Sequence, residues 1–489
     1  MTDQHRRNLL NCYGNGVVHT PAVSRLAAEG SVFDHAYTTQ PVCTPARASL
    51  QTGLFPCTHG MQSNLFCPGC IVHELPDRPE LLSRRLKDAG YSVGHTGKWH
   101  LGYGADAYDD PWFAEHDIES CVFNLRLPEA YRKASSLPSD LGYEGDDFPG
   151  HGGGGHGYRQ YQAYLDQNGL EHRIENRHRG SGEVVSEPES TIDHFLADRA
   201  IHWIDEFRRR PQPFFFALHF WGPHEPAYVP SRFLDPYREL PLQPWPNFLD
   251  NRTRKPAIHD VTRHAGTDAG WAFHERSIRS HMAYGDFIDH QIGRVLGHLD
   301  RTGLYDNTIV IFAADHGDAL GCHGGLVNKG YHFYEETVAI PLVIKPAHNN
   351  TAAGRVRALV SLTDIYSTIL DAAGVPDGAS RRHGRSLLPL VRGEQPPDWP
   401  DVVSVECTSV AYLQFSQRMI RRGDVKYVWN CGDVDELYDL SADPYELVNL
   451  AFDAARCELL DSMRRALVDR LEWLDDPIIR YHRGTFRGS

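Results

Sequence analysis

The stretch PVCTPARASLQTG, residues 41–53, joins a cysteine to a predicted helix in a way that suits anion chemistry. Cys43 and Thr44 lie at or near the expected helix start, Pro45 suits the first turn, and Arg47 follows one turn later. A helix start presents free N–H groups and a positive dipole end, and Arg47 adds a cation that can bind an oxyanion through two hydrogen bonds. On these residues alone, Cys43 is either a thiolate nucleophile or a buried structural thiol.

Polar side chains directly follow three other predicted strands. The strand at 307–314 leads into ADHGD, the strand at 213–220 into WGPHEP, and the strand at 91–96 into GKWHLG. The candidate site residues in these segments are Lys98, His100, His224, Asp315 and His316. Each of them alone is more simply interpreted as a solvated surface residue. Because ligands bind outside the carboxyl ends of strands in open α/β sheets, their shared position predicts one site.

The elements that must position these residues alternate between helix and buried strand. Amphipathic helices are expected at 20–30, 78–90, 190–210 and 281–303, and the last two precede the apolar strands 213–220 and 307–314. This alternation predicts an α/β fold with a mostly parallel central sheet flanked by helices.

The alternation is interrupted twice. Residues from about 105 to 185 are rich in polar residues and contain HGGGGHG, so we expect an insertion over the sheet. GEQPPDWPD, after about residue 390, is typical of a linker. We therefore predict a larger domain at 1–390 and a smaller C-terminal α+β subdomain at 391–489.

The composition narrows the possible partners. The chain has 489 residues and a net charge of −15, which argues against a nucleic-acid partner. No stretch approaches the roughly 20 apolar residues of a membrane span. Residues 1–12 are polar and show no signal peptide, which favours a cytoplasmic chain as it stands. A start upstream would hide such a signal, so the location stays open.

The ten cysteines are too few for a disulfide scaffold. Cys67 and Cys70 form a CxxC motif, but no second pair or thioredoxin-like context accompanies it. We therefore interpret this motif as a loop with two free or locally paired thiols.

The stretch Cys-Thr-Pro-Ala-Arg at 43–47 resembles the Cys-x-Pro-x-Arg signature of type I sulfatases, which are formylglycine-dependent enzymes of the alkaline phosphatase superfamily. The resemblance covers nearly the whole chain. It continues through GKWHLG, FFFALHFWGPHEP, the block at 315–344, VSLTDIYSTILDAAG and ELYDLSADPYELVNLA. So many ordered matches make a chance resemblance very improbable, and they imply an alkaline phosphatase-like fold.

The resemblance implies that the chain is a sulfuric ester hydrolase. A maturation enzyme that reads the signature would oxidise Cys43 to Cα-formylglycine, whose hydrate attacks the sulfur of a sulfate ester. The implied metal ligands are Asp3, the modified Cys43, Asp315 and His316. This donor set suits calcium first, with magnesium or manganese as alternatives.

The resemblance also implies roles for the remaining candidates. Arg47 matches the arginine that anchors the formylglycine, and His100 matches the histidine that contacts the diol. Lys98 and Lys329 match the lysines that bind sulfate oxygens. His224 and Lys329 match groups near the leaving oxygen, and one of them should donate the proton to it.

The sequence departs from the family pattern at its start. Many members carry Asp-Asp where this chain has Asp3-Gln4, and an apolar strand normally precedes that pair. Gln4 could still offer a neutral oxygen to the metal. Either the chain continues upstream of Met1 or the sheet lacks a central strand, which would leave Asp3 on a frayed end. We expect a chain that starts here to fold poorly or to bind metal weakly.

Two alternatives accompany the sulfatase hypothesis. Asp3-Gln4 also resembles phosphonate monoester hydrolases and phosphodiesterases of the same superfamily, whereas the cations of GKWHLG favour a sulfate ester. The second alternative is a non-catalytic binding protein in which Cys43 is unmodified. The substrate is expected to be a small-molecule or carbohydrate sulfate ester, with a mild preference for carbohydrate because the loop at 225–280 is rich in Pro, Trp and His.

Overall fold

The computed structural model describes most of the chain. The described residues are 1–65, 67, 70–72, 74–102, 136–145, 159–178, 180–265, 270–348, 354–376, 382–410, 413–482 and 484. Much of the predicted insertion, including HGGGGHG, lies outside these residues.

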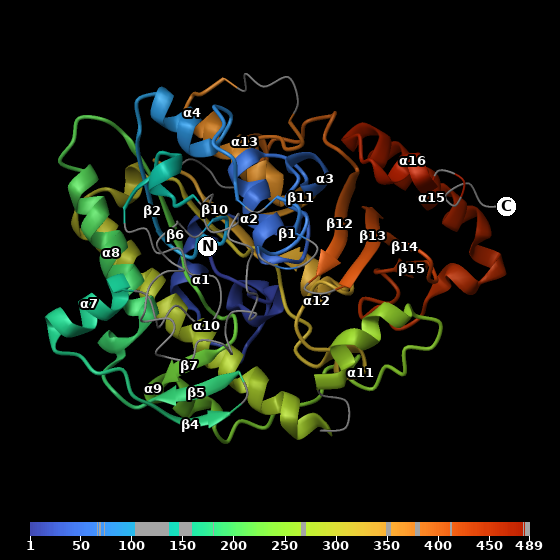
Figure 1. Cartoon of the computed structure of the whole chain (residues 1–489), viewed down its shortest axis with the longest axis horizontal. Coiled ribbons are helices and arrows are strands. Elements are labelled where there is room, and N and C mark those ends of the chain that lie inside the picture. Colours follow the sequence, from blue (N-terminus) through green and yellow to red (C-terminus); the bar gives the residue numbers. More distant parts are fainter. Residues whose placement is uncertain are drawn as a thin grey trace.

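The core is a sheet in two parts, with strand order β11-β1-β10-β8 in one and β6-β2-β3 in the other (Figure 1). The strands are β1 Ser31–Tyr37, β2 Ser92–Gly97, β3 Glu144–Gly145, β6 Phe214–His219, β8 Val310–Ala313, β9 Ala339–Ile340, β10 Leu342–Lys345 and β11 Arg355–Ser361. β10 runs antiparallel to β1 and β8, and β9 runs antiparallel to β1, while the pairs β1–β11, β2–β3 and β2–β6 are parallel. The predicted mostly parallel sheet is confirmed.

The first three residues join the two parts of the sheet. The backbone N–H of Thr2 donates to Ala313 O at 3.0 Å, and that of Asp3 donates to Gly222 O at 3.0 Å, so this short segment pairs in parallel with both sides. Asp3 is fully buried. The expectation that Asp3 lies on a frayed end is therefore wrong, because both flanking strands hold its backbone.

Beyond this segment the sheet has a gap. β6 and β8 face each other across this gap. Met1–Asp3 pairs only at the carboxyl ends of these strands, and no described residue pairs with the earlier part of either facing edge. The Met1 α-amino group donates to Leu218 O at 2.7 Å, and burial lowers its pKa to about 5. Phe214 and Ile311, on the two facing strands, remain partly exposed. No strand of the described residues fills this part of the sheet.

Helices cover both faces of the sheet. They are α1 Pro21–Glu29, α2 Cys43–Thr52, α4 Leu82–Asp88, α8 Ile192–Phe207, α10 Gly270–Arg301 and α13 Leu362–Ala372. Val23 of α1, Ile204 of α8 and Leu296 of α10 share one core cluster, which lies on one face. Ala46 of α2 and Ile365 of α13 belong to a cluster on the other face. The predicted flanking of the sheet by helices is confirmed.

One helix is longer than predicted. α10 begins at Gly270, whereas the sequence predicts a start at 281. Trp271 and Ile278 in its first three turns pack in the core cluster around α8, and this packing stabilises the additional turns. The short helices of the structure are α3 Pro56–His59, α9 Ser231–Leu234, α11 Cys322–Gly325, α12 Glu335–Val338 and α14 Leu388–Val391. Among the described residues, no helix is both long enough and apolar enough to cross a bilayer.

The C-terminal part forms the α+β unit that the sequence predicts, at the orange and red end of the chain (Figure 1). Its antiparallel strands are β12 Val402–Val410, β13 Leu413–Arg422, β14 Val425–Asn430 and β15 Glu436–Asp439. Its helices are α15 Cys457–Leu474 and α16 Ile478–His482. Leu467 of α15 packs in a cluster with Ile420 and Trp429 of the sheet.

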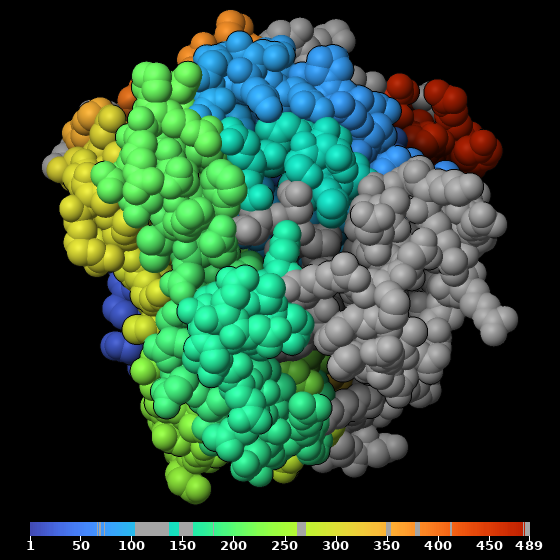
Figure 2. Space-filling view, turned by 60° about the vertical axis from the view of Figure 1, so that its left-hand side comes forward, coloured from blue at the N-terminus to red at the C-terminus, as the bar shows by residue number. Residues whose placement is uncertain are grey.

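The predicted insertion is only partly an addition over the sheet. β3 lies within it, yet pairs with β2 and so extends the central sheet. The other described elements are α7 Arg159–Asn168, β4 Ile174–His178 and β5 Ser181–Val184, and β5 pairs in parallel with β7 Ala227–Pro230. This segment forms part of one surface, in turquoise to green (Figure 2). It brings residues 180–184 beside the loop that follows β6.

Candidate active site

Helix α2 fixes Cys43 at the centre of the molecule. Val42 has extended backbone angles and caps the helix, Cys43 is its first residue, and Pro45 lies in the first turn as predicted. All ten residues of α2 are buried. The helix ends at Gly53, whose φ of 67° and contact with the Tyr366 ring leave no room for a Cβ. A helix packed this tightly holds the side chain of Cys43 in one place.

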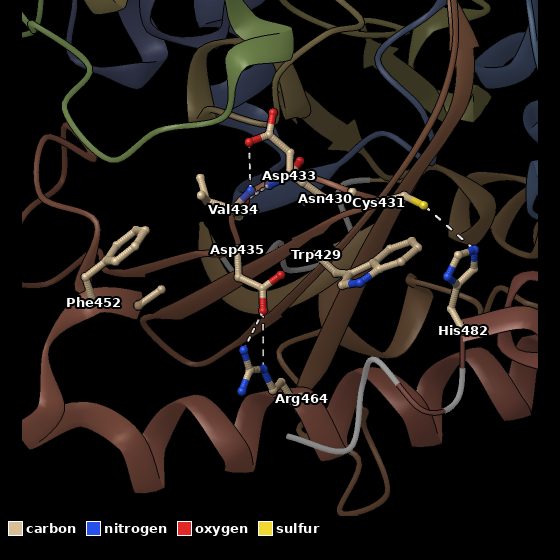
Figure 3. Close-up of a pocket in the computed structure, with 11 residues that line it drawn as sticks. Trp429, Asn430, Cys431, Asp433, Val434, Asp435, Phe452, Arg464 and His482 are labelled. Atoms are coloured by element: carbon tan, nitrogen blue, oxygen red, sulfur yellow. Dashed lines mark hydrogen bonds and ion pairs between the residues drawn. The ribbon is translucent and has the colours of Figure 1, made fainter. Parts of the chain in front are cut away.

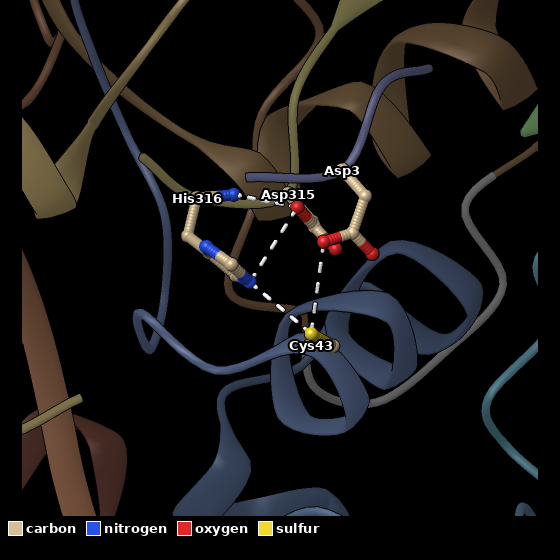
Figure 4. Close-up of side chains that lie close together, drawn as sticks. All are labelled: Asp3, Cys43, Asp315 and His316. Carbon is tan, nitrogen blue, oxygen red and sulfur yellow. Dashed lines mark hydrogen bonds and ion pairs between the residues drawn. The ribbon is translucent and has the colours of Figure 1, made fainter. Parts of the chain in front are cut away.

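Three side chains from two other segments converge on the Cys43 sulfur (Figure 4). The donor atoms of Asp3, Cys43, Asp315 and His316 all lie within 4.8 Å of one another. Cys43 Sγ is 3.3 Å from His316 Nε2 and 3.8 Å from Asp3 Oδ1. The four residues expected to bind a metal are therefore together and buried.

These donors fit a hard divalent cation. His316 Nδ1 lies 3.0 Å from the carbonyl oxygen of Gly317, which can only accept a hydrogen bond. Nδ1 must therefore carry the proton, and the lone pair of Nε2 faces Cys43 and the two carboxylates. Two carboxylates with one imidazole suit calcium, magnesium or manganese.

Two cations neutralise the carboxylates. Arg47 donates to Asp3 Oδ2 at 2.8 Å and to Asp315 Oδ2 at 3.0 Å, while Lys98 Nζ lies 2.5 Å from Asp3 Oδ2. Burial and the nearby Cys43 thiol oppose ionisation of Asp3, yet Lys98 and Arg47 hold its pKa well below the usual value. Both cations thus contact the candidate metal ligands.

The same environment activates Cys43. Burial alone would raise the pKa of its thiol, but Lys329, Lys98 and His316 together hold that pKa well below its usual value. Lys98 Nζ is 3.6 Å from the sulfur. The site is therefore built to hold negative charge at this position.

Two histidines flank the sulfur. Both His100 and His224 are within hydrogen-bonding reach of Cys43. Burial lowers the pKa of His100 to about 4, and burial with Lys329 and Lys98 lowers that of His224. His224 Nδ1 is 2.6 Å from the carbonyl oxygen of Glu225, so this nitrogen carries the proton and Nε2 is left for the site.

Lys329 and Gln4 are bound to each other. The Lys329 ammonium donates to Gln4 Oε1, and Gln4 Nε2 donates to Asp318 Oδ2. The Gln4 oxygen thus accepts a hydrogen bond from Lys329. Every predicted site residue is nevertheless brought to this one edge of the sheet.

Sequence reasoning missed two neighbours of these residues. The Trp221 ring lies 4.6 Å below the Lys98 ammonium, and Asp318 holds the Gln4 amide. Trp221 lies in WGPHEP, which contains the predicted site residue His224, and Asp318 lies in DHGD, which contains Asp315 and His316. A buried cation needs a counter-charge or an aromatic face, and this requirement could have found Trp221.

Other clusters of polar side chains in the described part of the chain are already neutralised. In the C-terminal unit, Arg464 pairs with Asp435 in an open pocket that contains none of the predicted site residues (Figure 3). Asp476, near Cys57 and Glu406, is paired with Arg418 at 2.6 Å. We therefore assign the chemistry to the Cys43 site.

Comparison with known proteins relates nearly the whole chain to one family. The profile of the sulfatase family matches residues 1–375, and that of the C-terminal region of N-sulphoglucosamine sulphohydrolase matches residues 322–472. The chain is 30% identical to a multifunctional protein of the alkaline phosphatase superfamily from Trinickia caryophylli, over 94% of this chain and 91% of that protein. It is 29% identical to an arylsulfatase of Clostridium perfringens, over 96% and 93%.

A solved structure gives the same result for the fold. A protein determined in complex with its substrate, D-glucosamine-2-N,6-O-disulfate, superposes with a TM-score of 0.71 at 21% identity, covering 98% of this chain and 97% of that one. The fold is therefore alkaline phosphatase-like. The chain belongs to the sulfatase family and is a sulfuric ester hydrolase.

Proposed function

We propose that this chain releases sulfate from an ester through a formylglycine formed at Cys43, with a divalent cation held by Asp3, Asp315, His316 and the modified residue. The observation that carries the proposal is the set of cations around a buried Cys43 sulfur that sits 3.3 Å from His316. In the mature enzyme an oxygen of the formylglycine hydrate would take the position of this sulfur.

The second hydroxyl of the hydrate allows sulfate to be released from the covalent intermediate. One hydroxyl attacks the ester sulfur and the S–O bond to the alcohol breaks, so the sulfate becomes bound to the residue. The second hydroxyl then loses its proton, the carbonyl reforms and sulfate leaves. Release therefore needs no attack by water on the intermediate. A plain cysteine or serine has no second hydroxyl, so its adduct would need such an attack.

The residues of this chain divide the charges between them. Lys98 and Lys329 bind the sulfuryl oxygens, and Arg47 holds the formylglycine and the two carboxylates. His224, with Nδ1–H bonded to Glu225, has Nε2 available to transfer a proton at the leaving oxygen. When bound, the divalent cation, calcium in this proposal, supplies Lewis-acid polarisation of the sulfuryl group.

The substrate we propose is a sulfated carbohydrate. The solved relative contains a disulfated glucosamine, and the stretches that surround the site here are rich in polar and aromatic residues.

The test is peptide mass spectrometry across Cys43, on protein co-expressed with a formylglycine-generating enzyme. The expected result is a loss of about 18 Da at Cys43 together with hydrolysis of 4-nitrophenyl sulfate. The Cys43→Ala variant, carried through the same procedure, should show neither. An unmodified thiol in an active preparation would overturn the proposed mechanism.

Gln4 favours a second candidate, a phosphonate monoester hydrolase. A neutral amide in place of a carboxylate leaves the site with one negative charge fewer. The same converted protein is therefore assayed on the 4-nitrophenyl ester of phenylphosphonate. A higher kcat/KM for that ester than for the sulfate would replace our first proposal with this one.

A further inference from the structure

A narrow hollow lies beside the loop that carries His224. Pro223 and Glu225, which flank His224 in the sequence, form one wall. Asp318 forms another, and it accepts a hydrogen bond from the Gln4 amide, whose oxygen accepts from Lys329. Through Pro223 and Glu225 the hollow adjoins the loop that carries His224, and through Asp318 and Gln4 it is linked to Lys329. It therefore lies near the two residues assigned to the leaving oxygen.

The remaining walls bring polar groups from other elements. Ser280 and His281 come from α10, and Ser181 comes from β5. His281 is 5% exposed, and its Nε2 has no hydrogen-bond partner among the described residues. A buried ring nitrogen without a partner is unfavourable, which indicates that a group absent from the structure belongs there.

The size and chemistry of the hollow restrict that group. Its volume is about 10 Å³, which admits one water-sized group and excludes a sugar ring. Its walls offer carboxylates that accept hydrogen bonds, and an imidazole and hydroxyls that can donate or accept. A hydroxyl group is small enough and can donate to one side while accepting from the other.

We infer that this hollow binds one hydroxyl group of the alcohol, on a carbon next to the one that carries the sulfate. This inference rests on the proposed function. It makes His281 and Ser280 specificity-determining residues, since they contact neither the sulfur nor the candidate metal ligands. It predicts that the enzyme selects sulfate esters of polyols over those of simple alcohols.

The test compares three esters that differ only at this position: cyclohexyl sulfate and the cis and trans isomers of 2-hydroxycyclohexyl sulfate. We expect the wild-type enzyme to hydrolyse one hydroxylated isomer with a kcat/KM about tenfold or more above that of cyclohexyl sulfate. His281→Leu removes the ring nitrogen, and Ser280→Val fills the hollow with an extra carbon branch. Both should abolish the preference and leave cyclohexyl sulfate hydrolysis within about twofold.

His290→Leu is the matched control, because His290 lies on the same helix but outside the hollow and is exposed. It should keep the preference. Melting temperatures of all variants verify that each is folded. The two hollow variants act differently, because His281→Leu removes a polar atom from the hollow whereas Ser280→Val fills it. Equal preference in wild type and both hollow variants, with cyclohexyl sulfate still hydrolysed, would overturn this inference alone. No hydrolysis of any of the three esters by converted enzyme would overturn the proposed function as well.

Discussion

At the scale of single residues, Arg47 allows two buried carboxylates to lie beside Cys43. It contacts Asp3 and Asp315 at once and also donates to Lys98 O at 2.8 Å. All of these side chains are 2% exposed or less. The energetic value of Arg47 therefore lies in preventing repulsion between groups that the chemistry requires to be close together.

We predict that Arg47→Ala lowers the free energy of unfolding by about 3–5 kcal/mol in protein stripped of cations, because it leaves buried charges without compensation. Millimolar calcium should recover part of this loss by binding to the same carboxylates. Urea denaturation with and without calcium measures both effects. Arg209→Ala, which removes an exposed ion pair with Glu206, should cost less than about 1 kcal/mol. Equal losses in the two variants would refute the assignment.

Asp193 sets part of the pH dependence of stability. It is buried on α8 and accepts a hydrogen bond from the Tyr284 hydroxyl at 2.8 Å. Burial raises its pKa to about 7, against the influence of that hydrogen bond. Between about pH 4 and pH 7 the native state therefore binds more protons at this group than the unfolded state does, so its contribution to stability is lost as the pH rises.

Asp193→Asn removes this contribution and keeps an acceptor for Tyr284. We predict that the stability of the variant relative to wild type increases with pH, by up to about 1.4 kcal/mol per pH unit in this window. Urea denaturation at pH 4.5, 5.5 and 6.5 provides the measurement, with the exposed Asp469→Asn as control. A stability difference that stays constant over this range would show that Asp193 does not titrate as described.

At the scale of elements, the short segment Met1–Asp3 is the most unusual part of the sheet. It connects β8 and β6 and positions a candidate metal ligand, yet the facing edges of these strands continue past it. Backbone groups on such edges and partly exposed side chains such as Phe214 lose the burial that a central strand would give.

A strand supplied in this gap should stabilise the fold. We predict that four added residues, Val-Ile-Val-Leu, placed directly before Met1 raise the free energy of unfolding by about 2 kcal/mol or more, through pairing on both sides and apolar burial. The control is an extension of Gly-Ser-Gly-Ser, which has the same length but little apolar surface. Thermal unfolding of the three proteins is the measurement. An identical melting temperature for both extensions would mean that the gap does not accept a strand.

Much of this architecture could be predicted from local sequence signals. Thr20-Pro21 and Gly30 bound α1 closely, and the apolar run at 213–220 fixed β6, because caps and apolar strands are written in consecutive residues. The convergence on Cys43 also followed from strand ends. The contact of Gln4 with Lys329 could not be predicted, since it joins residues 325 positions apart. The first turns of α10 could not be predicted either, because their sequence is mostly polar. Their apolar side is recognised only from its packing in the cluster around α8.

At the scale of the whole molecule, the larger domain and the C-terminal unit share one apolar cluster. Val42, the residue before Cys43, packs with Val338 and with Val405 and Met419 of the C-terminal sheet. Lys426 of β14 is fully buried and pairs with Glu335 of α12 at 3.1 Å. The division at residue 390 therefore remains a prediction from the sequence, and the two parts share this cluster.

We predict that the chain unfolds in a single cooperative transition. Exposing the C-terminal sheet would expose Val42 and leave the Glu335–Lys426 charges unpaired, so neither part is stable without the other. Differential scanning calorimetry should give one peak whose calorimetric and van't Hoff enthalpies agree. Two resolved peaks would show that the units fold independently.

The ion pair between Lys426 and Glu335 gives the molecule a built-in reporter of its own opening. The Lys426 ammonium is fully buried, so an acylating reagent reaches it only when the C-terminal sheet separates from α12. The rate at which Lys426 is acylated, compared with that of the exposed Lys87, therefore measures how often these two parts of the molecule separate.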